Sequence, residues 1–201
     1  MSYSGNVYNG CRSLDFCAGW NLITVERLYK QAYGHSLYKS MYEISDVTNR
    51  VQMMVSKVEQ ITGIVDFGGY MSKLLAVDAL FLNEDRHTHN IAVMTNDKKQ
   101  FRLAPIFDNG AGLLSDTTME YGMGQDVISL IAKVKPKTFC DDFDEQLDIV
   151  EHLYGKRICF SFGYEQVKNI VDKCYIYDEE IRKRVIEVVM QMRRKYEYMF
   201  E

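Results

Sequence analysis

The sequence is short of prolines and of long apolar runs. Pro105 and Pro136 are its only prolines, and no low-complexity stretch separates one part from another. We therefore expect one continuous domain over residues 1–201. No apolar run approaches the roughly 18 residues that a membrane span requires, and residues 1–10 are too polar for a signal peptide. We expect a cytoplasmic protein that does not bind a membrane.

The cysteine spacing and the net charge indicate the compartment of the protein and the partners that it lacks. No C-x-x-C pair occurs, and the five cysteines are scattered (Cys11, Cys17, Cys140, Cys159 and Cys174). An odd, scattered set indicates free thiols in a reducing compartment. The net charge is −4 at pH 7, which makes the chain a poor candidate for whole-surface nucleic-acid binding, and the basic residues of the last helix read as a solvated face. We expect no direct nucleic-acid partner.

Helical periodicity dominates what is present. Residues 46–62 place apolar side chains on one face and are followed by Gly63, while residues 70–82 are apolar around most of the helix. Thr24 is suited to cap a helix that ends before Gly34. Residues 1–20 read as irregular. Helices are predicted over 24–33, 46–62, 70–82, 126–133, 142–154, 164–173 and 178–199.

One short segment between these helices has the pattern of a β-hairpin. Residues 91–94 are β-prone, residues 96–99 have the composition of a turn, and residues 101–103 alternate between apolar and polar. The predicted fold class is therefore mainly α with a small β-hairpin. The hairpin also returns the chain to its starting point, so the residues that flank it are expected to lie together.

Those flanking residues have the chemistry of phosphoryl transfer. Asp85 and Asn90 stand in a D-x-x-x-x-N spacing before the hairpin, and Asp108 follows it. Phosphoryl transfer needs a carboxylate that accepts the proton of the attacking hydroxyl, and oxygen ligands for Mg²⁺. The spacing is that of a kinase catalytic loop, with Asp as base and Asn as metal ligand. Alone it recurs by chance, and the neighbouring motifs give it weight.

Two motifs together carry a resemblance to a known family. Residues 83–90 read N-E-D-R-H-T-H-N and residues 103–108 read L-A-P-I-F-D. The pair resembles the motifs of HipA-like serine/threonine kinases, over residues 70–115 and more loosely over 132–146. The implied fold is a protein-kinase-like C-terminal lobe of the HipA type, with the catalytic motifs at 83–110. Residues 1–40 match nothing in that family.

The resemblance implies roles, cofactors and a substrate class. Asp85 takes the position of the catalytic base, and Asn90 and Asp108 take the metal positions. The cofactors would be ATP and Mg²⁺, bound by Asn90, Asp108 and His87. Relatives of this type phosphorylate serine or threonine of proteins, and several are toxins of toxin–antitoxin systems. The implied partners are a protein substrate and an antitoxin or N-terminal-lobe chain, and self-association is open.

The sequence lacks part of a complete kinase. Before Asp85 there is no G-x-G-x-x-G loop and no apolar strand with an embedded lysine, the two elements that hold ATP phosphates. We expect a C-terminal lobe without an N-terminal lobe. Three alternatives stay open. The chain is a half-kinase completed by another polypeptide, a fragment of a longer kinase, or a catalytically inactive pseudokinase that serves as a protein-interaction module.

Four polar residues near the motifs have more than one interpretation. Asp78 is the one acid in its apolar helix, and it either braces the catalytic loop or lies on a solvated stripe. Arg86 either contacts Asp108 or a backbone carbonyl, or is solvated. His87 and His89 form an H-x-H pair that resembles half a zinc site, but no third ligand is evident. Hydrogen bonds within the loop are the preferred role for His87.

Overall fold

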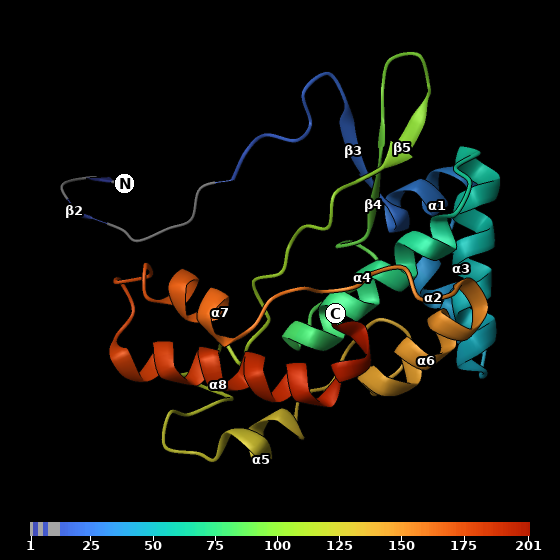
Figure 1. The fold of residues 1–201 in the computed structure, drawn as a ribbon. Coiled ribbons are helices and arrows are strands. Elements are labelled where there is room, and N and C mark those ends of the chain that lie inside the picture. Colours follow the sequence, from blue (N-terminus) through green and yellow to red (C-terminus); the bar gives the residue numbers. More distant parts are fainter. Residues whose placement is uncertain (1, 4–5, 8–12) are drawn as a thin grey trace.

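The computed structural model describes residues 2–3, 6–7 and 13–201. Within them the fold is mainly helical with one small three-stranded antiparallel sheet, as the predicted fold class requires (Figure 1). The sheet lies at one end of a helical body, and the long helix α8 (Glu179–Lys195) runs along the other. The catalytic motifs lie between these two parts, because residues 83–90 connect α4 to the sheet.

Two predicted helices begin and end where their capping residues indicate. Helix α1 (Val25–Tyr33) is capped by the Thr24 side chain, which accepts from the Arg27 amide, and ends at Gly34 in the left-handed conformation. Helix α3 (Val47–Thr62) is capped by Asp46 and ends at left-handed Gly63. Only a residue without a Cβ adopts that conformation at little cost, so each glycine fixes its helix end.

Helix α4 (Phe67–Phe81) is the buried centre of the fold. It begins three residues before the predicted start and packs most extensively against α6 (Phe143–Tyr154). Gly68 allows that approach, because a Cβ there would lie 2.3 Å from the Tyr154 ring. Apolar side chains line α4 on nearly every side, as its sequence predicted (Met71, Leu74, Leu75, Ala76, Ala79 and Leu80). A helix held this firmly gives the following loop a fixed origin.

The sheet contains the predicted hairpin and one further strand. Strands β4 (Ala92–Thr95) and β5 (Phe101–Leu103) form the hairpin, and β3 (Asn21–Thr24) pairs antiparallel with the free edge of β4. The prediction of irregular structure over residues 1–20 needs a correction as well. Two short strands, β1 (Ser2–Tyr3) and β2 (Asn6–Val7), pair antiparallel near the start of the chain.

The segment that matched no family motif is part of the fold from residue 21 onward. Strand β3 leads directly into α1, and a short helix α2 (Leu37–Tyr42), absent from the prediction, follows. Their apolar side chains join the same core as α3 and α4 (Val25, Leu28, Tyr29, Leu37 and Met41). These elements cover the sheet side of the catalytic loop.

The remaining predicted helices are present with shifted ends. They are α5 (Val127–Ile131), α6, α7 (Tyr164–Val171) and α8, which is followed by a 3₁₀ turn, η1 (Glu197–Met199). The acidic start of α6 has a structural role, since the Asp142 side chain accepts from the amides of Asp144 and Glu145. Residues 104–126 contain no helix or strand and cross from the sheet to α5.

Two predictions made from the composition, on membrane-spanning helices and on free cysteines, can be compared with the described residues. None of the described helices is long and apolar enough to cross a membrane. Cys17, Cys140, Cys159 and Cys174 are free thiols, as expected, and Cys11 lies outside the described residues.

Candidate functional site

The catalytic-loop motif begins at the end of the buried helix α4. Leu82 takes the left-handed conformation (φ 53°) and ends the helix, and the Asn83 amide donates back to the Asp78 carbonyl at 2.9 Å. Asn83 is buried, whereas Asp85, two residues later, has 47% of its side chain exposed. The loop therefore turns one acid toward solvent at a position fixed by the core.

The Asp85 carboxylate lies between two basic side chains. Its Oδ1 is 3.7 Å from the Lys137 ammonium nitrogen, and its Oδ2 is 3.8 Å from Nε2 of His87. These distances are longer than normal hydrogen bonds, so the carboxylate oxygens keep capacity to accept another donor. An exposed carboxylate of this kind can accept a proton from a hydroxyl placed beside it.

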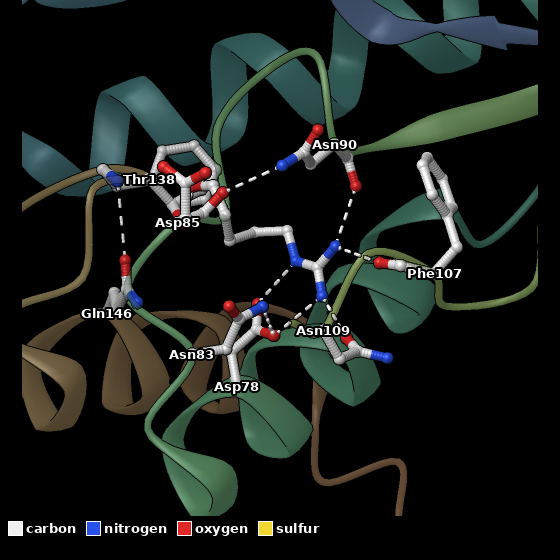
Figure 2. Close-up of polar contacts among 10 residues, drawn as sticks. Asp78, Asn83, Asp85, Asn90, Phe107, Asn109, Thr138 and Gln146 are labelled. Carbon is white, nitrogen blue, oxygen red and sulfur yellow. Dashed lines mark hydrogen bonds and ion pairs between the residues drawn. The ribbon is translucent and has the colours of Figure 1, made fainter. Parts of the chain in front are cut away.

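Asn90 is tied to Asp85 through the backbone. Its side-chain amide nitrogen donates to the Asp85 carbonyl at 3.0 Å, and its own backbone amide donates to the His87 carbonyl at 2.8 Å (Figure 2). The nitrogen of the side chain is thereby used, and the side-chain oxygen is the atom left for a cation. Figure 2 shows this oxygen on the side of Asn90 that faces away from the Asp85 carbonyl.

Arg86 brings the residues before and after the hairpin together. Its Nη1 donates to the Asn90 carbonyl at 2.9 Å and to the Phe107 carbonyl at 2.6 Å. One nitrogen thus holds both segments, and Asp108 follows Phe107 immediately. The backbone just before Asp108 is thereby held next to the Asn90 carbonyl. Asp108 is exposed and has a left-handed backbone (φ 56°).

The same arginine is anchored in the core by Asp78. Arg86 is fully buried, and its Nε and Nη2 donate to the two oxygens of Asp78 at 2.8 and 2.9 Å. Nη2 also donates to Oδ1 of Asn109 at 2.5 Å. Burial raises the pKa of the Asp78 carboxyl, while the bonds from Arg86 and Asn83 lower it. Of the open interpretations, the structure therefore selects the brace for Asp78 and the backbone contacts for Arg86.

The sequence motifs missed two residues from a distant segment. Lys137 approaches the Asp85 carboxylate, and the Thr138 hydroxyl donates to the Arg86 carbonyl at 2.7 Å. Both lie about fifty positions after the loop and just before α6. The only sequence signal was the looser family resemblance over 132–146, which named neither residue. Asn109 was also passed over, because its place after Asp108 reads as ordinary turn composition.

A wide hollow opens on the far side of His87 and Lys137. Its volume is about 790 Å³, and α1, α2 and the segment before α6 form its walls. Glu26 lines this hollow, and its carboxylate accepts hydrogen bonds from the Thr88 hydroxyl and the Tyr38 amide, both at 3.0 Å. Burial raises the pKa of Glu26, but its hydrogen bonds outweigh this and hold the pKa below the ordinary value. This volume lies within the usual range for a ligand-binding pocket.

The residues that the motifs suggest for a metal differ in their donor atoms. In residues 2–3, 6–7 and 13–201, no group of three or more His, Cys, Asp and Glu is arranged to hold a metal ion. The His87 and His89 rings lie edge to face with centroids 5.7 Å apart, and Nδ1 of His87 accepts from the His89 amide. Asn90 and Asp108 supply two oxygen donors, which suits a cation that keeps waters and phosphate oxygens in its shell.

Comparison with known proteins supports the fold and nothing finer. No protein-family model matches the chain, and no curated protein sequence matches it. Three chains among the solved structures match. One of these is the Helicobacter pylori proinflammatory kinase CtkA, which is 16% identical, with a TM-score of 0.61 over 90% of this chain and 67% of that one. The chain therefore has a kinase-like fold.

Proposed function

We propose that this chain is the catalytic lobe of a HipA-like serine/threonine protein kinase. It would transfer the γ-phosphoryl group of ATP to a hydroxyl of a protein substrate, within a toxin–antitoxin system or a related one. The kinase-like fold supports a phosphotransferase. The observation that carries the proposal is the Arg86 junction, which joins the loop of Asp85 and Asn90 to the segment of Asp108 in one buried network.

In this proposal the chain's own residues bind, orient and move a proton. Asp85 accepts the proton of the substrate hydroxyl, whose oxygen is then the attacking atom. Lys137, 3.7 Å from the Asp85 carboxylate, places a positive charge where negative charge develops. His87 holds the loop through the bond from the Asn90 amide to its carbonyl.

The oxygens of Asn90 and Asp108 would hold Mg²⁺ with the ATP phosphates. When bound, the ion neutralises phosphate charge and holds the phosphates in line with the attacking oxygen. Residues 1–84 contain no Gly-rich loop and no strand lysine of the kinase type. We propose that a partner polypeptide or a further part of a longer chain supplies them, and that the chain is active in that assembly.

Phosphotransfer with Asp108→Asn tests the proposal. Transfer of ³²P from ATP by the assembled protein should require Mg²⁺ and fall roughly 10²–10³-fold in the variant, the scale of lost electrostatic stabilisation in active sites. The control is Asp97→Asn, which changes an exposed acid in the hairpin turn and should leave transfer unchanged. Equal activity of Asp108→Asn and wild type would contradict the metal role.

The rival function is a non-catalytic interaction module. It predicts no transfer in any reconstitution and a stable partner complex that is insensitive to Asp85→Asn. That pair of results, with the partner lobe present, would replace the kinase proposal.

A further inference from the structure

A second pocket lies behind the segment that follows Asp108. It has a volume of about 360 Å³ and is bounded by residues 109–117, the end of α7 and the first turns of α8. None of Asp85, Asn90 and Asp108 lines it. Its size is within the usual range for a small-molecule site. The pocket is therefore separate from the groups that the proposed reaction uses.

The charges that line this pocket have one sign. Arg182 and Arg184 of α8 both line it, and no aspartate or glutamate does. Two arginines that share a small space repel each other unless an anion compensates them. The hydroxyls of Ser115 and Thr117 and the apolar side chains of Leu113 and others complete the wall.

The arginine side chains hold unused hydrogen-bond donors. Arg184 is 6% exposed, and its Nη1 and Nη2 donate to the carbonyls of Tyr121 and Leu114. Its Nε is buried and has no hydrogen-bond partner in the part of the chain that the structure describes, and the same is true of Nε of Arg182. Burial also lowers the pKa of Arg184. Neither Nε is open to the pocket, but the Nη groups of Arg182 make no hydrogen bond within the described residues, so they are the donors left for an acceptor in the pocket.

We propose that this pocket is a phosphate-binding site for a small organic phosphate. A phosphate group offers only acceptors and matches the planar donors of arginine. The apolar side chains of Leu113, Val171 and Val185 suit the organic part. The phosphate has two conceivable sources, a free molecule or a phosphoester on Ser115 or Thr117, and both present the same group to Arg182 and Arg184.

Phosphate binding in this pocket would be coupled to the catalytic loop through two hydrogen bonds. Arg184 holds the Tyr121 carbonyl at 2.5 Å, and the Tyr121 hydroxyl donates to the Glu84 carboxylate at 2.7 Å. Glu84 directly precedes Asp85. The inference does not depend on phosphotransfer, since it concerns binding alone.

Titration of the full chain with phenyl phosphate and with inorganic phosphate tests the site. We expect saturable binding of phenyl phosphate, weaker binding of inorganic phosphate, and shifts of two arginine Nε–H resonances in the NMR spectrum. Arg182→Gln should weaken phenyl phosphate binding about tenfold or more, the effect of losing charge-assisted hydrogen bonds. The control Arg194→Gln alters an exposed arginine of the same helix and should change binding less than about twofold.

A second experiment distinguishes a free phosphate ligand from a phosphoester on Ser115 or Thr117. Phosphopeptide mapping of the protein from cells shows whether Ser115 or Thr117 is modified, and Ser115→Ala and Thr117→Ala remove those positions. Modification that shifts the same Nε–H resonances and blocks phenyl phosphate supports the site with an internal occupant. The proposal is overturned if the unmodified chain binds neither probe and neither hydroxyl is phosphorylated. Equal binding by Arg182→Gln and wild type would overturn it as well.

Discussion

The buried junction beneath the catalytic loop and the exposed edge above it are built in opposite ways. Arg86 is fully buried, and its guanidinium donates five hydrogen bonds, to Asp78, Asn90, Phe107 and Asn109. Its neighbour Asp85 is half exposed, and its carboxylate has only two basic groups at 3.7 and 3.8 Å. Arg86 and Asp85 are adjacent in the chain. The Arg86 guanidinium uses its hydrogen-bond donors within the fold, whereas the Asp85 carboxylate can still accept further hydrogen bonds.

This difference separates the residues that stabilise the fold from the residue to which we assign the proton transfer. A buried ion pair that loses one partner leaves an uncompensated charge, so the junction resists change. An exposed carboxylate contributes little to folding, which leaves it free to bind a substrate and exchange a proton. Substitutions in the two regions should therefore separate the free energy of unfolding from phosphotransfer.

The largest loss of stability is expected from Arg86→Leu. Asp78 would stay buried without its partner, at a cost of about 3–5 kcal/mol in the free energy of unfolding. Urea denaturation followed by circular dichroism measures it, with Arg102→Leu, which changes an arginine stacked on Trp20, as the control. Removing both charges in Asp78→Leu/Arg86→Leu should restore part of the loss. A cost below about 1 kcal/mol for Arg86→Leu would break the comparison.

A smaller loss is expected from Glu26→Gln. Glu26 accepts from Thr88 and Tyr38, and hydrogen bonds to a charged group contribute about 1.5–3 kcal/mol. The folded-state pKa of Glu26 lies below its ordinary 4.5. Its stabilisation is therefore present above pH 4.5 and is lost as the pH falls through the folded value.

Denaturation across pH checks the Glu26 prediction. The difference between wild type and Glu26→Gln should be full near neutral pH and should shrink below pH 4.5. The matched control is Glu43→Gln, at an exposed position just after α2. A difference that grows as the pH falls would have the wrong sign for this account.

The sequence predicted elements that depend on local signals and missed those that depend on distant partners. Caps at Thr24 and Gly34 and the periodicity of α3 and α4 were sufficient for their helices. Strand β3 was missed because four residues carry little pattern, and it forms by pairing with β4 some seventy positions later. The six-residue helix α2 was also missed, although the still shorter α5 was predicted.

The same division holds for the candidate site. Asp85 and Asn90 came from one motif spacing, Asp108 from the hairpin that precedes it, and His87 from the loop between them. Their catalytic and binding roles stay predictions. A single acid in an apolar helix left Asp78 open between a brace and a solvated stripe, and only the structure shows that it is buried against Arg86. Lys137 and Thr138 reach the loop only because α6 packs on α4, and no local pattern reports that contact.

The smallest effect on stability, and the most direct test of the central claim, is expected from Asp85→Asn. The free energy of unfolding should stay within about 0.5 kcal/mol of wild type, as for an exposed side chain. Phosphotransfer by the assembled protein, measured with ³²P-labelled ATP in the same preparation, should fall about 10²–10⁴-fold through loss of the base. Activity within a few-fold of wild type, or unfolding as costly as in Arg86→Leu, would contradict the account.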